Sequence, residues 1–554
     1  MLKYKQEKAV YNEGGSVGMG MYLNSIAPYE KYKETSGDLY FIDKTKILEE
    51  LIPVMSKMDK YICITRPRRF GKTVMANMIA AFLGKAYDSS AVFNKLKIAE
   101  SNLYKNHLNS YDVIYIDFSE TPEICRNYEQ YITRIIKGLK NDFKTIYPEL
   151  NSDSDLSIWD MITSIFEKYQ QKFVFIIDEW DAVFHMSFMT EKDKTEYMLF
   201  LKSLLKSKAY VSLAYMTGVL PISKYSSGSE LNMFMEYDMS VKIRFSNYFG
   251  FTENEVEELY GRYIENNAEH HITLDGLTQW YDGYHTASGE RMYNPRSVVC
   301  ALMNNQLTDY WTNSGPYDEI FFYIKNNIDD IRDDLALMIS GERVRVKIQD
   351  YAAVSMELKT RNQIYSAMVV YGLLTYEDGE VFIPNEELMI KFSETLQEHE
   401  SLGYIYRLAR ESEKMLRATL ENDTETMAQI LQYTHDTETP ILSYNHETEL
   451  SAVVNLAYLS ARDRYRIERE DKAGRGYVDF IFYPVKPADD CIILELKVND
   501  TPENAIEQIK KKQYAVKFKG KIGETSRYKG RILAVGISYN KKDTKHYCKV
   551  EILQ

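Results

Sequence analysis

The feature that most constrains this chain is a strand, a tight loop and a helix in direct succession near residue 70. The apolar run 61–64 predicts a buried strand, and the apolar stretch 74–83 predicts a helix. Backbone N–H groups at the start of such a helix bind phosphate, Lys72 would reach the outer phosphates, and the Thr73 hydroxyl would ligate Mg²⁺. The order of elements therefore predicts a phosphate-binding loop, with the sequence Arg66-Pro67-Arg68-Arg69-Phe70-Gly71-Lys72-Thr73.

This loop departs from the general P-loop pattern at one position. The pattern has a glycine five residues before the Gly of Gly-Lys-Thr, and Arg66 stands there in this chain. A Gly-Lys-Thr at a helix start also arises by chance, so the loop alone leaves an ordinary helix start as the alternative. The nucleotide hypothesis depends on what the neighbouring strands supply.

A second apolar run, 172–177, ends in Asp178-Glu179-Trp180-Asp181. A buried strand that delivers a carboxylate to the edge of a sheet has the layout of a Walker B segment, in which Asp178 would hold the Mg²⁺ and its water shell. Glu179 would orient or deprotonate the attacking water. An acidic loop after a core strand is the alternative, but the Gly-Lys-Thr upstream favours the nucleotide site.

Two further apolar runs, 113–119 and 211–216, alternate with helical patterns. Such alternation predicts a parallel sheet covered on both faces, with ligands at the carboxyl ends of its strands. Thr217 would either sense the γ-phosphate or cap the next turn, and both interpretations stay open. The residues expected at the nucleotide are Arg66, Arg68, Arg69, Phe70, Gly71, Lys72, Thr73, Val74, Asp178 and Thr217.

The C-terminal part of the chain predicts a β-hairpin that carries charged side chains. Glu495 and Lys497 lie two residues apart, so they share one face of a strand, and Asp479 on the partner strand can join them. One Asp and one Glu can hold a hard divalent cation, and a lysine beside them can position or deprotonate water for attack on a phosphodiester. A solvated strand face is the alternative, but flanking helices and the Asp across the hairpin favour a metal-dependent nuclease site.

The charge distribution bears on possible partners. A net charge of −13 argues against a protein that binds nucleic acid over its whole surface. Residues 505–549 nevertheless contain 11 Lys and 2 Arg against 2 Glu and 1 Asp. This segment could follow a phosphate backbone, and a solvated lysine-rich helix is the alternative. Its cations include Lys510, Lys511, Lys512, Lys517, Lys519, Lys521, Arg527, Lys529 and Arg531.

The five cysteines are widely spaced and form no Cys-x-x-Cys pair. This disfavours a disulfide framework and a zinc site, and it fits a reducing cytoplasm. The N-terminus has no apolar core of a signal peptide, and no stretch is long enough to span a bilayer. We therefore expect a cytoplasmic protein without a membrane partner.

With these residues in view, the chain resembles bacterial and archaeal proteins that pair an AAA-ATPase-like domain with a C-terminal PD-(D/E)xK nuclease-superfamily domain. The likeness covers nearly the whole chain from about residue 20, and the family shares the Arg-Pro-Arg-Arg-Phe-Gly-Lys-[Ser/Thr] loop. The matching segments are 41–45, 66–73, 177–181, 217–219, 250–252, 293–297, 383–387, Asp479, Glu495-Leu496-Lys497 and the helix with Gln508 and Tyr514.

The resemblance implies ATP and Mg²⁺ at Lys72 and Thr73, with Asp178 and Glu179 as the Walker B pair. Asp479, Glu495 and Lys497 would form a nuclease triad that uses Mg²⁺ or Mn²⁺. Glu449, with Glu447 as a competitor, would be a supporting metal ligand. The chain departs from the family in Trp180-Asp181 and in lacking an evident Tyr-His pair on the first nuclease helix.

The expected fold is α/β: a P-loop sheet domain with a helical lid and connector, followed by a restriction-endonuclease-like domain. We expect a lead-in at 1–35, the ATPase at 36–250, the lid at 251–335, the connector at 336–439 and the nuclease-like domain at 440–554. Thr252 and Glu255 predict a capping box at the lid's first helix. Arg244 and Arg296 could contact phosphate, although each is more often a surface ion pair.

The leading hypothesis is an ATP-regulated, Mg²⁺-dependent nuclease acting on nucleic acid, with DNA favoured over RNA. The alternative is an ATPase switch whose nuclease-like domain only binds nucleic acid or a partner protein. The sequence leaves the oligomeric state open, a homo-oligomer included.

Overall fold

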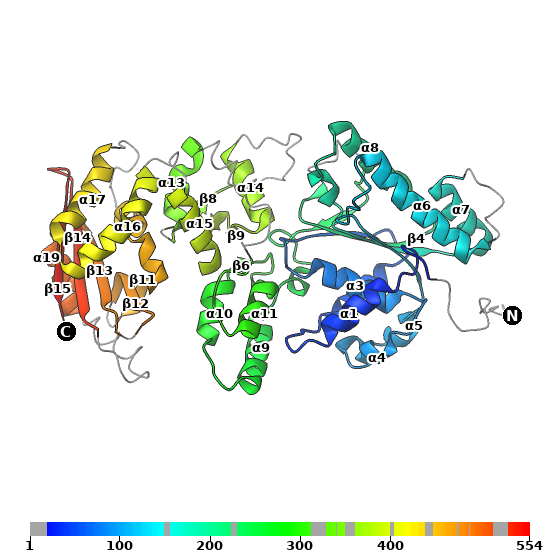
Figure 1. Ribbon diagram of the computed structural model, residues 1–554, viewed down its shortest axis with the longest axis horizontal. Helices are drawn as coiled ribbons and strands as arrows, with labels where there is room; N and C mark the ends of the chain where they lie inside the picture. The colour runs from blue at the N-terminus through cyan, green and yellow to red at the C-terminus, as the bar shows by residue number, and fades with distance from the viewer. Residues whose placement is uncertain are drawn as a thin grey trace. The chain divides into compact units, whose positions relative to one another are not determined.

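The computed structural model describes residues 19–148, 156–222, 230–311, 328–339, 341–348, 360–398, 404–437, 447–473, 476–486, 488–512 and 530–553. The chain divides into two compact units (Figure 1). The first unit comprises residues 1–311, 348–357 and 366–377, and the second comprises residues 312–347, 358–365 and 378–554.

The first unit is built on a parallel sheet with the strand order β2-β3-β4-β1-β5. Every neighbouring pair of strands in it is parallel. This confirms the parallel sheet expected from the apolar runs. The strands are β1 (Tyr61–Thr65), β2 (Asp112–Asp117), β3 (Phe173–Asp178), β4 (Val211–Gly218) and β5 (Met235–Tyr237).

Helices cover both faces of this sheet because its strands are apolar on both sides. Ile62 and Ile64 pack toward one face and Tyr61 and Cys63 toward the other, as the period of two requires. The first face carries α1 (Ala27–Ser36) and α3 (Lys72–Leu83), with the short helices α4 (Ser90–Phe93) and α5 (Tyr104–His107) nearby (Figure 1). The second carries α6 (Tyr128–Ile146), α7 (Ile158–Tyr169) and α8 (Glu191–Leu205).

The expected loose lead-in at 1–35 is wrong for its last part, because α1 begins at Ala27. Tyr29 and Tyr32 of this helix are buried in the same core cluster as α3, and this packing fixes the helix in place.

A small helical group completes the first unit. It consists of α9 (Glu253–Asn266), α10 (Leu274–Tyr281), the short strands β6 (Tyr284–His285) and β7 (Arg291–Met292), and α11 (Pro295–Asn304). The predicted capping box is confirmed, since the Thr252 side chain accepts from the Glu255 N–H and the Glu255 side chain accepts from the Thr252 N–H. Tyr40 and Ile42 share the core of this group, so the segment before the P-loop is packed against it.

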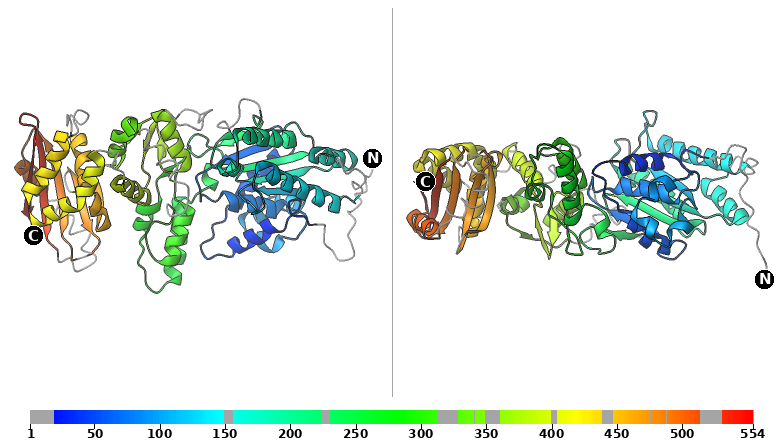
Figure 2. Two further views of the ribbon diagram at one scale, coloured as in Figure 1. Left: turned by 45° about the horizontal axis from the view of Figure 1, so that its top comes forward. Right: turned by 90° about the horizontal axis from the view of Figure 1, so that it is seen from below.

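The second unit contains a mixed sheet with the order β11-β12-β13-β14-β15 (Figure 2). The predicted hairpin is β12 (Gly476–Pro484) with β13 (Cys491–Val498), and it is antiparallel. The other strands are β11 (Tyr465–Ala473), β14 (Ile532–Asn540) and β15 (Lys545–Ile552). Helix α19 (Pro502–Lys511) packs on this sheet through Ile506 and Ile509.

Further helices belong to the second unit, namely α13 (Ile328–Ile339), α15 (Glu386–Glu398), α16 (Tyr404–Glu421), α17 (Thr424–Thr437) and α18 (Glu447–Ala457). The short strands β8 (Val344–Arg345) and β10 (Glu380–Phe382) pair in the same unit. Helix α14 (Arg361–Tyr371) is divided between the units, and β9 (Thr375–Glu377) belongs to the first. No helix in the described ranges is long and apolar enough to cross a membrane.

Candidate nucleotide and nuclease sites

The loop before α3 turns sharply so that its backbone faces the start of the helix. Gly71 has a φ of +85°, and Arg69 has a φ of +69°, so both lie in the left-handed region. A Cβ on Gly71 would meet nothing within 4 Å, which shows that the space above the loop is open. This is the backbone shape that a phosphate-binding loop needs, and it confirms that Lys72 and Thr73 begin α3.

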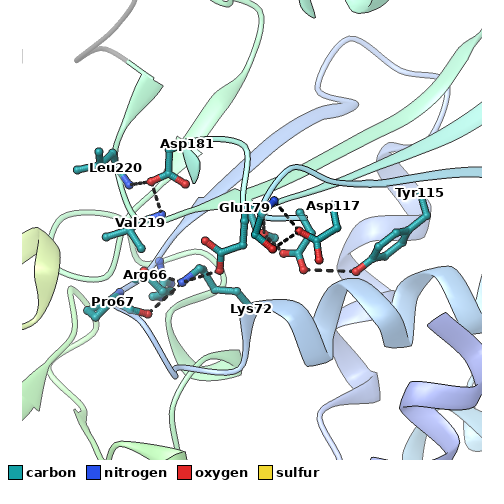
Figure 3. Close-up of polar contacts among 12 residues, drawn as sticks. Arg66, Pro67, Lys72, Tyr115, Asp117, Glu179, Asp181, Val219 and Leu220 are labelled. Atoms are coloured by element: carbon teal, nitrogen blue, oxygen red, sulfur yellow. Dashed lines mark hydrogen bonds and ion pairs between the residues drawn. The ribbon is translucent and has the colours of Figure 1, made fainter. Parts of the chain in front are cut away.

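Lys72 lies at the centre of the site. Its side chain is only 3% exposed, and its Nζ donates to the carbonyls of Arg66 at 3.1 Å and Pro67 at 3.2 Å. The Glu179 carboxylate lies 3.7 Å away on the opposite side (Figure 3). The ammonium is therefore held between the loop and the residue expected to activate water.

Asp178 ends β3 and is fully buried. It accepts hydrogen bonds from the hydroxyls of Thr217, Tyr115 and Thr73. Burial raises the pKa of Asp178 to about 6, and the hydrogen bond from Thr217 opposes the rise. A Thr73 hydroxyl beside a buried carboxylate is a donor set of hard oxygens, which fits Mg²⁺.

Thr217 contacts both Asp178 and the turn that follows it, and a role toward the γ-phosphate stays a prediction. Its hydroxyl bonds to Asp178, and its carbonyl accepts from the Trp180 N–H at 2.9 Å. The side chain therefore fixes the orientation of Asp178. Glu179, the next residue, has a φ of +49°, a strained conformation that is found more often at functional sites than elsewhere.

Asp181 makes hydrogen bonds to the backbone that the sequence did not predict. Its Oδ2 accepts from the backbone N–H groups of Val219 at 3.0 Å and Leu220 at 2.7 Å (Figure 3). Burial, followed by the charge of Glu179, raises the pKa of Asp181 to about 6. This carboxylate ties the end of β4 to the loop after β3.

A cavity of about 590 Å³ opens above the phosphate-binding loop. Loop residues line one side, and Glu179 lies beside them. Further lining residues come from α1, from the segment 40–42 and from α11, and many of them are apolar or aromatic. The part of the lining that matters for a nucleotide consists of Arg69, Gly71, Lys72, Thr73, Val74, Tyr32, Phe41, Lys44, Arg296 and Val299.

Three arginines of the prediction take different places. The Arg66 guanidinium is buried and donates to the carbonyls of Thr65, Tyr237 and Phe245, so the side chain anchors the loop and does not line the cavity. Arg68 is also outside the lining, whereas Arg69 and Phe70 belong to it.

The two arginines considered for phosphate contact differ in whether they line the cavity. Arg244 contacts the Glu50 carboxylate and carbonyl and stacks on Phe245, which is the surface ion pair that the sequence left open. Arg296 lies in the first turn of α11 and lines the cavity. The structure therefore favours Arg296 over Arg244 as a neighbour of the nucleotide.

Lys44 is a cavity residue that sequence reasoning missed. Its Nζ donates to the Glu255 carboxylate at 2.7 Å and to the Asn247 carbonyl at 2.9 Å, so it connects the cavity wall to the capping box of α9. The Asp43 carboxylate accepts a hydrogen bond from the Thr45 hydroxyl and another from the Lys97 N–H at 2.6 Å. The only signal in the sequence was the family segment 41–45, which carried no assigned role.

The second candidate site is on the hairpin of the C-terminal sheet. The Glu495 Oε1 accepts from Lys497 Nζ at 3.1 Å, which confirms that the two side chains share a face. Asp479 lies on β12, and its Oδ2 accepts from the Leu496 N–H at 2.7 Å. The three predicted residues are thus brought together around one strand.

Glu495 is in an unusual environment for a carboxylate. Burial, and then the charge of Asp479, raise the pKa of Glu495 to about 7. Its Oε1 accepts from Lys497 and Gln508, whereas its Oε2 is buried and has no hydrogen-bond partner among the described residues. A buried oxygen with an unused acceptor position fits a divalent cation, which Asp479 and Glu495 would hold.

The other residues predicted for this site do not all contact Glu495. Gln508 on α19 contacts Glu495, but Tyr514 and the cations from Lys517 to Lys529 lie outside the described residues. Glu449 lies in the first turn of α18, a helix that buries Leu450 and Val453. Within the described ranges no three His, Cys, Asp or Glu side chains come together to hold a metal, so Glu449 does not complete such a cluster.

Comparison with known proteins identifies both regions. A family model described as a predicted AAA-ATPase matches residues 25–227. A model of the PD-(D/E)XK nuclease superfamily matches residues 445–546. The chain joins an AAA-ATPase-like domain to a PD-(D/E)XK nuclease-superfamily domain. The resemblance noted in the sequence is confirmed.

Solved structures offer only distant similarity to this ATPase–nuclease fusion. A Walker-type ATPase of Pyrococcus abyssi is 13% identical over 63% of this chain and 94% of its own, with a TM-score of 0.33. The ORC2 protein of Aeropyrum pernix is 10% identical over 70% of this chain and 96% of its own, with a TM-score of 0.29. No curated protein matches the chain.

Proposed function

We propose that this protein binds and hydrolyses ATP in its first unit and cleaves nucleic acid with a Mg²⁺-dependent site in its second unit. The observation that carries the nuclease part is the convergence of Asp479, Glu495 and Lys497, with one buried oxygen of Glu495 that has no partner in the part of the chain that the structure describes. When bound, the cation would activate water and neutralise charge on the phosphodiester. Lys497 would orient the water and stabilise the developing negative charge.

The ATPase part is supported by the cavity and by the groups that surround it. Lys72 is placed to neutralise the outer phosphates, and Thr73 and Asp178 would hold Mg²⁺. Glu179 reaches the cavity from the end of β3 and would orient the attacking water. The aromatic residues of the cavity lining, Tyr32, Tyr40 and Phe41, are suited to the adenine base, because bases bind to flat apolar surfaces.

We further propose that the nucleotide state controls the nuclease. Gly372 lies against the P-loop, since a Cβ at this position would meet the Pro67 ring at 2.7 Å. The segment that carries it ends at Glu377, after which the chain passes into the second unit. A shift of the loop on binding phosphate would therefore act directly on the segment that leads to the nuclease domain.

A second set of contacts, through β6, connects the P-loop to the 366–377 segment. Phe70 packs edge-on against Tyr284, with 4.9 Å between the ring centres. The neighbouring His285 donates its N–H to Thr375 at 2.8 Å and lies 2.7 Å from the Glu377 carboxylate. The P-loop thus contacts the 366–377 segment both directly and through β6, which supports the proposed control.

Cleavage assays test the nuclease proposal. The full chain is incubated with supercoiled plasmid, single-stranded DNA and RNA in Mg²⁺ or Mn²⁺, beside Lys497→Ala, Asp479→Ala and the exposed control Lys486→Ala. We expect DNA to be cut, both site variants to be inactive and the control to match the wild type. Cleavage that survives in both site variants would refute the assignment.

One observation favours a second function, a switch that binds nucleic acid or a partner without cutting. Only two carboxylates converge on the described part of the nuclease site, and no third metal-ligating side chain joins them. Titration of the full chain with Mn²⁺ separates the two functions. A site lost in Asp479→Ala supports the nuclease, and the absence of any metal-dependent signal together with intact ATP turnover supports the switch.

A further inference from the structure

A basic groove lies between α16 and α17 of the second unit, and its lining does not include Glu495. It encloses about 550 Å³. Helix α16 contributes Arg407, Arg410 and Lys414 to its lining, and α17 contributes Tyr433. The groove lies upstream of residues 445–546, which match the nuclease family, so the family match does not account for it.

The cations follow one stripe of α16. Arg407, Arg410 and Lys414 are spaced three and four residues apart, which places them on adjacent turns of the same helical face. The one carboxylate in the described lining is that of Glu411, which lies 3.6 Å from Lys414. The groove therefore has an excess of positive charge in a chain whose net charge is −13.

Tyrosine rings stand beside these cations. Arg410 donates to the Tyr406 hydroxyl at 3.0 Å, and its guanidinium lies 5.7 Å from the centre of that ring. Tyr433 is 58% exposed on the opposite helix. Cations that contact phosphates, together with exposed aromatic faces on which bases stack, are the combination found in single-strand binding sites.

The groove is held firmly to the nuclease sheet. Gln432, next to Tyr433, donates to the Thr544 carbonyl at 2.9 Å and accepts from the His546 N–H at 3.1 Å. On α16, Thr419 and the Tyr458 hydroxyl are 2.6 Å apart. A strand bound between α16 and α17 would thus keep a fixed relation to the sheet that carries Asp479 and Glu495.

We propose that this groove binds a single-stranded segment of nucleic acid, with Arg407, Arg410 and Lys414 on its phosphates and Tyr433 stacked on a base. The inference rests on the proposed function in one respect, namely that nucleic acid is the substrate. Beyond that function, the inference identifies a place outside the catalytic triad where the strand is held. The tyrosines favour nucleic acid over an acidic polypeptide, which could use the cations but offers no bases for stacking.

The test measures binding without cleavage. Fluorescence anisotropy of a labelled single-stranded oligonucleotide is followed with the full chain in EDTA, at low and at physiological salt. The variants are the double charge reversal Arg410→Glu with Lys414→Glu, and Tyr433→Ala. Lys486→Glu, which reverses an exposed lysine outside the groove lining, is the matched control. Circular dichroism of each variant reports whether it is folded.

We expect the double variant to lose at least about tenfold in affinity and to show a weaker salt dependence, because two phosphate contacts are removed. Tyr433→Ala should lose roughly fivefold to a hundredfold through the lost stacking. Wild-type affinity in both folded variants, or no binding by the wild type, would overturn the proposal. Equal displacement of the strand by an acidic peptide of the same charge would also overturn it, in favour of a protein partner.

Cleavage is measured separately in Mg²⁺, so that the two proposals can fail independently. A chain that binds through the groove and cuts nothing would support this inference and refute the nuclease. A chain that cuts, while its groove variants bind the strand as the wild type does, would refute this inference alone.

Discussion

At the scale of single residues, the two candidate sites share buried carboxylates with raised pKa values. Burial raises the pKa of Asp178 to about 6 and that of Glu495 to about 7. The charged form of each is therefore held in a place that disfavours it. Such groups cost stability, and they are found preferentially where a ligand or a reaction uses them.

Glu495 permits a test in metal-free protein. Its folded pKa lies above the unfolded value, so its contribution to stability is present below pH 4.5 and is lost as the pH rises through about 7. In EDTA at pH 8, the free energy of unfolding of Glu495→Gln should therefore exceed that of the wild type by on the order of 1–3 kcal/mol. At pH 4 the two proteins should be nearly equal.

Urea unfolding at both pH values measures this difference, and Glu507→Gln on the exposed side of α19 is the matched control. Added Mg²⁺ should stabilise the wild type and leave Glu495→Gln unchanged, because ligand binding stabilises only the folded state that binds it. A glutamine variant that is less stable at pH 8 than the wild type would contradict this account of the carboxylate.

At the scale of elements, the strands were predictable and the cavity was not. The runs at 61–64 and 173–177 are continuous and apolar, which is typical of strands buried on both faces of a parallel sheet. The cavity wall joins α1, the segment 40–42 and α11, which lie far apart in the sequence. No local pattern indicates that Lys44 and Arg296 face the same space, because tertiary packing brings them together.

The same limit explains why the Arg66 side chain does not line the cavity. Arg66 was expected at the nucleotide because it stands in the loop, but backbone carbonyls of Thr65 and Tyr237 bind its guanidinium and hold it away from the cavity lining. On the hairpin, by contrast, the period of two was sufficient to place Glu495 and Lys497 on one face. A pattern predicts the face of a strand, whereas loop side chains depend on partners that are distant in sequence.

Arg296 on α11 should contribute to nucleotide affinity. It is exposed and lines the cavity, so Arg296→Ala should weaken ATP binding about tenfold or more through the lost charge-assisted contact, with little change in Tm. Isothermal titration calorimetry with a non-hydrolysable ATP analogue measures the effect. Arg244→Ala, which removes the contact with Glu50, is the control and should bind as the wild type does.

Gly372 should be intolerant of any side chain. Its φ is +81°, and an added Cβ would lie 2.7 Å from Pro67 and 3.3 Å from Trp311. Gly372→Ala should lower the free energy of unfolding by on the order of 2 kcal/mol and should also weaken ATP binding, because the P-loop is displaced.

Gly379→Ala provides the comparison for that variant. Gly379 has a similar φ of +87°, but a Cβ there meets nothing within 4 Å. It should therefore show the backbone strain alone and keep the ATP affinity of the wild type. Equal ATP affinity in both variants would show that the contact with Pro67 has no influence on the nucleotide site.

At the scale of the whole molecule, the chain joins an AAA-ATPase-like domain to a PD-(D/E)XK nuclease-superfamily domain. One unit carries the loop 66–73 on a parallel sheet, and the other carries Asp479, Glu495 and Lys497 on a mixed sheet. The 366–377 segment belongs to the first unit, approaches Pro67 at Gly372, and is followed in the sequence by the second unit. We propose that ATP in the first unit controls cleavage by the second.

The rate of DNA cleavage in Mg²⁺, with and without ATP, tests this claim most directly. It is measured for the wild type, for Lys72→Ala, which should not bind ATP, and for Glu179→Gln, which should bind ATP without hydrolysing it. We expect ATP to change the wild-type rate, Lys72→Ala not to respond to ATP, and Glu179→Gln with ATP to keep the rate of the ATP-bound state. Identical rates in all three proteins, with and without ATP, would contradict control of cleavage by ATP.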